Sequence, residues 1–87
     1  MNRSINLVYF SWVRERLGLD GEKFSLGEKV ETIGDVLALL ADRGAAYAEV
    51  FADIEKLRFA LDQDYGTIAS TLGSAQELAI FPPVTGG

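Results

Sequence analysis

The sequence contains neither cysteine nor histidine among its 87 residues. Without these side chains the chain can form no disulfide, no thiolate or imidazole metal site and no Ser-His-Asp or Cys-His catalytic arrangement. A chain without cysteine fits a reducing compartment, so we expect a cytoplasmic location. Carboxylates remain as possible acid–base groups or metal ligands, but the close pair Asp62 and Asp64 stands near a glycine, in the composition of an ordinary turn. We therefore expect no bound metal and no catalytic side chain.

Positive charge and long apolar runs are also scarce. Thirteen acidic residues against eight basic ones give a formal net charge of -5, which repels the phosphates of a nucleic acid. No run approaches the ~18 apolar residues that a membrane-spanning helix needs. We predict neither a nucleic-acid partner nor a membrane partner. At 48% hydrophobic residues, the chain can bury the core of one domain.

Two early segments have the pattern of strands. Residues 5–10 are rich in β-branched and aromatic side chains, which predicts a strand that is largely covered on both faces. Residues 22–28 alternate apolar with charged or small side chains, which predicts a half-exposed strand paired with the first as a hairpin. The intervening residues 11–18 are predicted to form a short helical turn or a loop.

The clearest helix follows Thr32. Apolar residues recur there at the spacing i, i+3, i+4 and i+7, at Ile33, Val36, Leu37 and Leu40. Thr32 is the expected N-cap, and Gly44 is expected just past the end of the helix. Residues 46–56 repeat the spacing and predict a second, shorter helical segment.

The last third of the chain returns to strand patterns. Strands are predicted at residues 57–61 and 77–81, with a turn at 62–66 and a weak strand or irregular link at 67–72. This order of elements is typical of an α+β protein with the β-grasp, or ubiquitin-like, arrangement: a mixed sheet, one main helix and a short second helical segment. That topology places the last strand parallel to the first. It also places Phe10 and Arg14 near Phe81.

The sequence closes with the motif FPPVTGG, which predicts a domain over residues 1–81 and an extended tail over residues 82–87. Pro82 and Pro83 cannot donate hydrogen bonds to a sheet and fix their own φ, so they should form a stiff stem. The small residues after the stem could enter a narrow channel that larger side chains would block: Val84, Thr85, Gly86 and Gly87. A frayed terminus is the alternative interpretation.

The end of this tail carries a carboxylate. Activation by ATP to an acyl-adenylate would let a sulfur donor replace one oxygen and leave a thiocarboxylate on Gly87. Since the chain has no cysteine, this is the one position where it could hold transferable sulfur.

Both ends of the sequence resemble a known family. VYFSWVRERLG, at residues 8–18, is similar to the first strand and turn of the small subunit of molybdopterin synthase, and ELAIFPPVTGG, at residues 77–87, is similar to the closing motif of that family. One departure is the sequence GSAQ at residues 73–76, where the family usually has an Asp-Gly-Asp type of turn.

The resemblance implies a cycle of sulfur transfer. An adenylyltransferase related to ubiquitin-activating enzymes would use ATP to activate Gly87, and a sulfur donor system would form the thiocarboxylate. The tail would then enter a large catalytic subunit and deliver sulfur to cyclic pyranopterin monophosphate, in a heterotetramer of two small and two large subunits. Catalytic side chains would belong to the large subunit, and this chain would bind no cofactor of its own.

Four residues are predicted to contact these partners: Phe81, Tyr65, Phe10 and Arg14. The aromatic Phe81 and Tyr65 are expected to be apolar anchors, with a place in the core as the alternative. Arg14 is expected to pair with an acidic group of a partner, with an ordinary solvated surface position as the alternative.

Three other functions remain open from the sequence. A sulfur carrier of the thiamine pathway shares the fold and the Gly-Gly end, although that family is typically shorter. A ubiquitin-like modifier would attach Gly87 to lysines of target proteins. A structural β-grasp interaction module would need no particular terminus.

Overall fold

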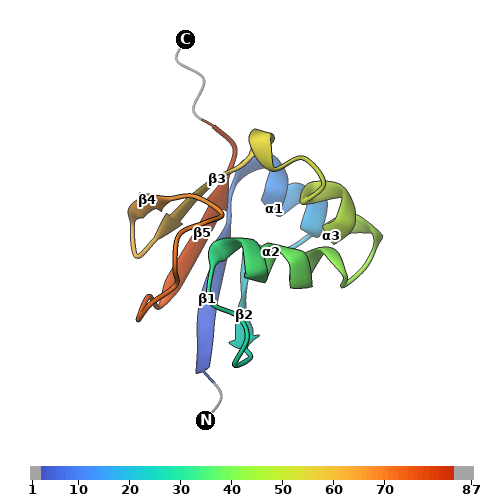
Figure 1. Cartoon of the computed structure of the whole chain (residues 1–87). Coiled ribbons are helices and arrows are strands. Elements are labelled where there is room, and N and C mark those ends of the chain that lie inside the picture. The colour runs from blue at the N-terminus through green and yellow to red at the C-terminus, as the bar shows by residue number, and fades with distance from the viewer. Residues whose placement is uncertain (1–2, 84–87) are drawn as a thin grey trace.

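A mixed sheet with helices packed on one of its faces forms the domain (Figure 1). The computed structural model describes residues 3–83. The strands are β1 (Arg3–Tyr9), β2 (Gly21–Leu26), β3 (Arg58–Leu61), β4 (Asp64–Gly66) and β5 (Glu77–Phe81). The helices are α1 (Ser11–Leu17), α2 (Ile33–Ala41), α3 (Ala45–Val50) and the 3-10 helix η1 (Ile54–Lys56). None of the helices in the described part of the chain is long and apolar enough to cross a membrane.

The five strands lie in the order β2-β1-β5-β3-β4. β1 and β2 form an antiparallel hairpin, and β5 lies parallel to β1, with Tyr9 opposite Ile80. β3 pairs antiparallel with both β5 and β4. The predicted β-grasp arrangement, with the last strand parallel to the first, is confirmed.

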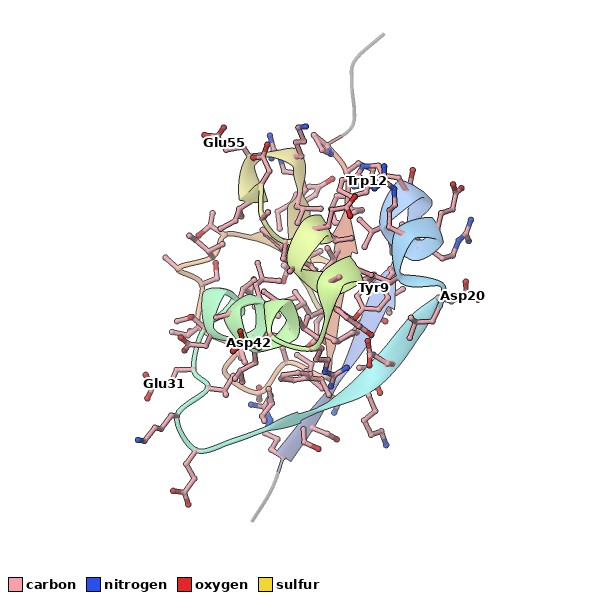
Figure 2. The ribbon with its side chains drawn as sticks, turned by 90° about the vertical axis from the view of Figure 1, so that its right-hand side faces the viewer. Tyr9, Trp12, Asp20, Glu31, Asp42 and Glu55 are labelled. Atoms are coloured by element: carbon pink, nitrogen blue, oxygen red, sulfur yellow. The ribbon has the colours of Figure 1, made fainter. Side chains whose placement is uncertain are left out.

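The core fills the space between the sheet and the helices. Strand residues that point to the helices are almost fully buried, among them Ile5, Leu7, Leu78 and Ile80. Helix residues that point back to the sheet are buried to the same extent: Val13, Ile33, Val36 and Leu40. Figure 2 shows this packed layer, with charged residues such as Glu31 and Glu55 on the outside.

The prediction that the first strand is covered on both faces is wrong. Tyr9 points into the core, whereas Asn6 is exposed and Val8 only half-buried on the opposite face. The helices cover a single face of the sheet, so the apolar residues of β1 divide between the core and the opposite face. Alternate residues build the core, and Val8 lies on a face that no helix covers.

Helix α2 begins as the sequence predicts and ends earlier. Thr32 and Asp35 form a reciprocal capping box, in which Asp35 N donates to Thr32 Oγ1 at 3.1 Å and Thr32 N donates to Asp35 Oδ2 at 3.0 Å. Hydrogen bonds from the backbone N–H groups of Glu31 and Thr32 hold the pKa of Asp35 below its usual value. The helix stops at Ala41, and Gly44 is the N-cap of α3 rather than the end of α2.

Two other segments differ from the prediction, whereas the irregular link expected at residues 67–72 is found. Residues 11–17 form a complete helix, ended by Gly18 in the left-handed conformation with φ 79°. The predicted turn at 62–66 is only two residues long, because Asp62 and Gln63 adopt positive φ and the chain continues into β4. Residues 67–72 contain no regular strand, but an isolated bridge joins Thr32 to Thr71.

A polar cluster fastens β2 to the helices. The carboxylate of Glu22 accepts hydrogen bonds from the hydroxyl groups of Tyr9, at 2.8 Å, and Tyr47, at 2.9 Å, and forms an ion pair with Arg43. The Arg43 guanidinium also lies over the ring of Phe24, 5.1 Å from its centroid. Because these residues come from β1, β2, α3 and the segment between α2 and α3, the Glu22 cluster closes one side of the core.

The cluster perturbs the acidity of its members. Burial alone would raise the pKa of Glu22, but the hydrogen bonds from Tyr9, Tyr47 and Arg43 outweigh burial and hold the pKa below its usual value. Burial, together with the Glu22 carboxylate, raises the pKa of the Tyr9 hydroxyl. The ionised carboxylate and the neutral phenol are therefore the forms that the fold stabilises.

We expect the Glu22→Gln variant to be less stable at neutral pH by about 1–3 kcal/mol, because a charged acceptor of several hydrogen bonds is lost. A lowered pKa in the folded state stabilises the protein above the unfolded-state pKa, and this contribution disappears as the pH falls through the folded-state pKa. The difference between wild type and variant should therefore shrink below about pH 4.3. Urea unfolding at a series of pH values measures it.

The Glu28→Gln variant is the matched control, since Glu28 is exposed in the loop after β2. It should change the free energy of unfolding by less than about 0.5 kcal/mol at every pH. A Glu22→Gln difference that stays constant down to acidic pH would contradict the assignment of the effect to the ionised carboxylate.

Candidate functional site

The root of the tail lies where β5 ends beside the start of α1 (Figure 1). The backbone N–H of Phe10 donates to the carbonyl of Ile80 at 3.2 Å. This hydrogen bond extends the pairing of β1 with β5 to the end of β5. β5 ends at Phe81, and Pro82 and Pro83 follow, half-buried. The remaining predicted tail residues, Val84, Thr85, Gly86 and Gly87, lie outside the described residues.

The uncovered face of the sheet carries apolar and aromatic side chains next to this root. The register places Val8 beside Ala79, Ala79 beside Ala60 and Ala60 beside Tyr65, and register partners share one face of a sheet. We call this surface, together with Phe10 and Phe81, the open sheet face. The alternation along each strand assigns the last two to it, because Tyr9 and Ile80 point into the core.

Exposure distinguishes anchors from core residues on this face. Tyr65 is 82% exposed, which excludes the alternative of a core position for this residue, and Phe10 is 47% exposed. Phe81 is half-buried, and its ring packs against Tyr65 with centroids 6.2 Å apart and a tilt of 49°. Ala60 and Ala79 between them are buried, so the exposed apolar groups of this face are its aromatic side chains, which are typical of protein–protein contacts.

The hairpin that carries Tyr65 is tied to the start of β5. The Oδ1 atom of Asp62 accepts hydrogen bonds from the backbone N–H groups of Gln76 and Glu77, both at 3.0 Å. Asp62 therefore has a structural role, and Asp64 does not join it in a site. Among the described residues no group of three or more Asp or Glu side chains is arranged to hold a metal ion.

Arg14 pairs with Asp20 rather than with a described residue of the tail root. Its Nε is 3.8 Å from Asp20 Oδ1, and both side chains are largely exposed. Trp12 and Arg16, which are one helical turn apart, share the face of α1 that meets the prolines. Arg14 lies two positions from each and so points elsewhere. The spacing of four residues was the signal in the sequence that could have singled out Trp12 and Arg16.

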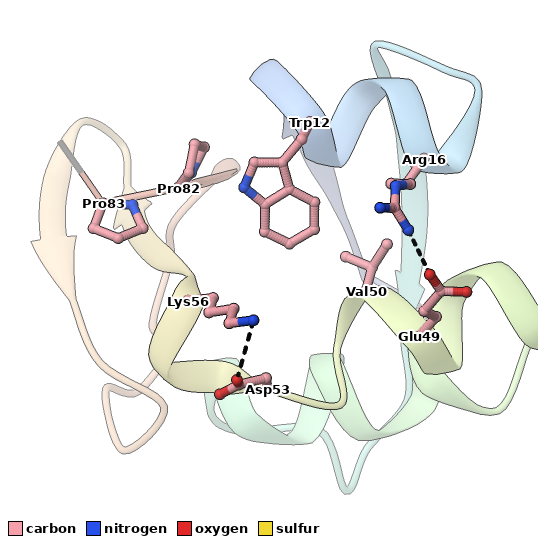
Figure 3. A pocket seen from close by; sticks show the side chains of 8 residues that line it. All are labelled: Trp12, Arg16, Glu49, Val50, Asp53, Lys56, Pro82 and Pro83. Atoms are coloured by element: carbon pink, nitrogen blue, oxygen red, sulfur yellow. Dashed lines mark hydrogen bonds and ion pairs between the residues drawn. The ribbon is translucent and has the colours of Figure 1, made fainter. Parts of the chain in front are cut away.

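A pocket of about 550 Å³ opens beside the prolines, on the helical side of the tail root (Figure 3). Its lining residues come from α1, α3, the η1 region and the tail root: Trp12, Arg16, Glu49, Val50, Asp53, Lys56, Pro82 and Pro83. Arg16 forms an ion pair with Glu49, and Lys56 Nζ lies 3.9 Å from Asp53 Oδ2. We call it the tail-root pocket. It was not predicted from the sequence, because its walls come from four separate segments.

The sequence matches the ThiS family over residues 7–87. This chain belongs to the ThiS family. The ThiS match reaches the last residue of the sequence and so includes the closing Gly-Gly motif.

Curated relatives of similar length match along nearly the whole chain. The molybdopterin synthase sulfur carrier subunit of Haemophilus influenzae is 32% identical over 83 residues, which cover 95% of this chain and 99% of that protein. The protein of the same name from Escherichia coli K12 is 33% identical over 84 residues, with 95% and 99% coverage. The resemblance to the small subunit of molybdopterin synthase is thereby confirmed.

Solved structures agree on the fold. A putative molybdopterin converting factor, subunit 1, from Pyrococcus furiosus superposes with a TM-score of 0.73 at 22% identity, over 93% of this chain and 98% of that one. SAMP1 from Haloferax volcanii superposes with a TM-score of 0.72 at 24% identity, over 98% and 100%. The ThiS family member described here thus shares its β-grasp fold with both proteins.

We expect Asp62→Ala to lower the free energy of unfolding by about 1–3 kcal/mol, because two backbone N–H groups lose their acceptor and alanine disfavours the positive φ at this position. Asp62→Asn keeps an acceptor oxygen and tolerates that conformation, so it should be much closer to wild type. Thermal and urea unfolding measure both. Asp64→Ala, two residues away and exposed, is the matched control, and an equal loss in that variant would contradict the role of Asp62.

Proposed function

We propose that the carboxyl group of Gly87 is the sulfur-bearing group of this chain. The chain is a sulfur carrier of molybdenum cofactor biosynthesis, as its relatives along nearly the whole length indicate. The observation that carries the proposal is the closing motif itself. It attaches a Gly-Gly end, through two prolines, to the end of β5 in a protein that has no cysteine.

The proposed cycle begins with activation. An oxygen of the Gly87 carboxylate attacks the α-phosphate of ATP in an adenylyltransferase related to ubiquitin-activating enzymes, and pyrophosphate leaves. A nucleophilic sulfide equivalent from a sulfur donor system then displaces AMP and leaves the thiocarboxylate. ATP is used by the activating partner, and this chain supplies only the acyl group.

Delivery follows in the large subunit of molybdopterin synthase. The stem of Pro82 and Pro83 directs the small residues Val84, Thr85 and Gly86 into a channel of that subunit. There the thiocarboxylate sulfur attacks an oxygen-bearing carbon of cyclic pyranopterin monophosphate, a carbon–oxygen bond of that carbon breaks as the carbon–sulfur bond forms, and the displaced oxygen takes up a proton, so that a thioester joins Gly87 to the pterin. Water then hydrolyses this thioester, which leaves the sulfur on the pterin and returns the Gly87 carboxylate. Two deliveries, from two small subunits used in turn or together, supply the two sulfur atoms of the dithiolene in a proposed heterotetramer.

The open sheet face is the proposed docking surface for both partners. Tyr65 is almost fully exposed and Phe81 stands at the tail root, so a partner that buries both would hold the tail at a fixed position relative to its channel. Phe10 extends the same surface on the other side of β5. Since one tail can occupy only one channel, the two partners would bind in alternation. Arg14 would meet an acidic group at the edge of a partner, in exchange for its exposed contact with Asp20.

The proposed place of action is the cytoplasm, where a thiocarboxylate and the thiols of a sulfur donor system persist in reduced form. The absence of cysteine from the sequence supports this location.

Deletion of Gly87 should abolish sulfur delivery and leave folding unchanged. The deletion moves the carboxylate back by about 3.3–3.6 Å, which exceeds the tolerance of positioned chemistry. The assay is conversion of cyclic pyranopterin monophosphate to molybdopterin by the reconstituted synthase, with chemically thiocarboxylated small subunit so that activation is bypassed. Wild-type turnover by the deletion variant would show that Gly87 is not the sulfur-bearing residue.

Further assays on the unmodified protein separate the other functions. Intact-mass analysis after incubation with the activating enzyme and sulfur donor should show exchange of one oxygen for sulfur on the C-terminal peptide. Transfer to a thiazole precursor instead of the pterin would favour a thiamine-type carrier, and an isopeptide bond to lysines would favour a modifier. Binding that survives extension of the chain by one residue, with no covalent change at any stage, would favour a structural module.

We expect Tyr65→Ala to weaken the affinity for the large subunit by about 10-fold or more, as for an exposed aromatic anchor. The free energy of unfolding should change by less than about 0.5 kcal/mol, because the side chain is 82% exposed. Isothermal titration calorimetry and urea unfolding measure the two quantities. Leu39→Ala, another exposed apolar residue, on α2, is the control for affinity, and equal affinities of Tyr65→Ala and wild type would remove the open sheet face from the interface.

A further inference from the structure

The tail root has two flanks, and the proposed function uses one of them. On one flank lies the open sheet face, with Phe81 and Tyr65. On the other lies the tail-root pocket, whose wall includes Pro82 and Pro83 (Figure 3). A protein that binds the tail at Pro82 and Pro83 would therefore come close to the mouth of this pocket.

The lining of the tail-root pocket favours an apolar group as its occupant. The indole of Trp12, the side chain of Val50 and the two proline rings supply apolar walls, and Figure 3 shows them around the space between α1 and the tail. The four charged lining residues form two ion pairs, Arg16 with Glu49 and Lys56 with Asp53. The rim thus carries no net charge, so a charged group would gain no net attraction there, whereas an apolar one would be desolvated against aromatic and aliphatic walls.

We propose that the tail-root pocket receives an apolar side chain of the large subunit of molybdopterin synthase, beside the mouth of the channel that takes the tail. The proposal rests on the proposed function, because that function brings the large subunit to Pro82 and Pro83. The pocket and the open sheet face would then hold the stem from both sides. Such a two-sided grip fixes the direction of the tail as well as its position.

A second copy of this chain is a poorer occupant. Each copy has a formal net charge of -5, and like net charges oppose association. The activating enzyme also has to enclose the tail, so it forms a separate arm of the experiment rather than part of the proposal.

The experiment uses the sole tryptophan of the chain, Trp12, as a reporter inside the pocket. Small subunit labelled with 15N-tryptophan gives a single indole N–H resonance, and Trp12 is only partly buried in the free domain. A soluble gadolinium chelate should broaden this resonance in the free protein. In the complex with saturating unlabelled large subunit, we expect the resonance to shift and to be protected from the chelate.

Variants test how much the pocket contributes to the affinity for the large subunit. Trp12→Ala should weaken the affinity for the large subunit by about 10-fold or more, whereas Leu39→Ala should leave it within about 2-fold. Circular dichroism reports whether Trp12→Ala is folded, and the labelled wild-type protein tests occupancy without any substitution.

Several outcomes would overturn the proposal. An indole that stays open to the chelate in the saturated complex excludes occupancy by the large subunit. Protection in the free small subunit that rises with its concentration identifies a second copy. Protection in the dilute free subunit that disappears on deletion of residues 84–87 identifies the chain's own tail. Protection only with the activating enzyme assigns the pocket to that partner instead.

Sulfur delivery measured on the same preparations separates this inference from the proposed function. If the thiocarboxylated wild type delivers sulfur while the indole stays exposed, the pocket inference is wrong and the carrier function stands. If the wild type neither binds the large subunit nor delivers sulfur, the pocket inference and the proposed function are both wrong.

Discussion

The parallel pairing of β1 with β5 is the constraint on which the rest of the molecule depends. It places the last strand in the interior of the sheet, between β1 and β3, so the tail starts from one of the best-fixed positions of the fold. It also brings the beginning of α1 to the end of β5, because β1 leads directly into that helix. The open sheet face and the tail-root pocket both arise from this one juxtaposition.

The helical layer and the sheet are joined by polar as well as apolar contacts. Glu22 links β2 to Tyr47 of α3 and to Arg43, and α3 in turn supplies Val50 and Glu49 to the pocket. The Glu22 cluster therefore contributes to the position of the pocket wall, although it lies on a different part of the domain. Stability and the geometry of the tail root are coupled through this short helix.

Much of the fold could be predicted from the sequence. A helix or strand that buries only one face shows a clear periodic pattern of apolar residues. The capping signal at Thr32 and the strand at Glu77–Phe81 were both located correctly. The helix at Ser11–Leu17 was underestimated, since only Val13 of its residues is fully buried and it has no side-chain cap. β4 was missed because its turn uses Asp62 and Gln63 at positive φ instead of the usual Asn-Gly or Asp-Gly pair.

The site was predictable only in part, for a related reason. Local sequence is enough to pick out the aromatic residues Phe81 and Tyr65 near strand ends. The two prolines are recognisable in the same way, because each restricts its own backbone conformation. Trp12 becomes recognisable only once α1, α3 and the tail are placed around it. Arg14 was expected near the tail root from the topology of the strands, but its position on α1, two residues from Trp12 and Arg16, turns it toward Asp20.

The position of β5 has a mechanical consequence. When a partner draws the tail into a channel while it holds the body of the domain, the force acts along β5, in the interior of the sheet. Its ladder with parallel β1 and its ladder with antiparallel β3 then resist sliding together, so many hydrogen bonds share the load and none is peeled off alone. A tail attached to an edge strand such as β4 would have a single ladder to hold it. A domain that carries its tail on this central strand can therefore bear a pull on its last strand without unravelling from that end.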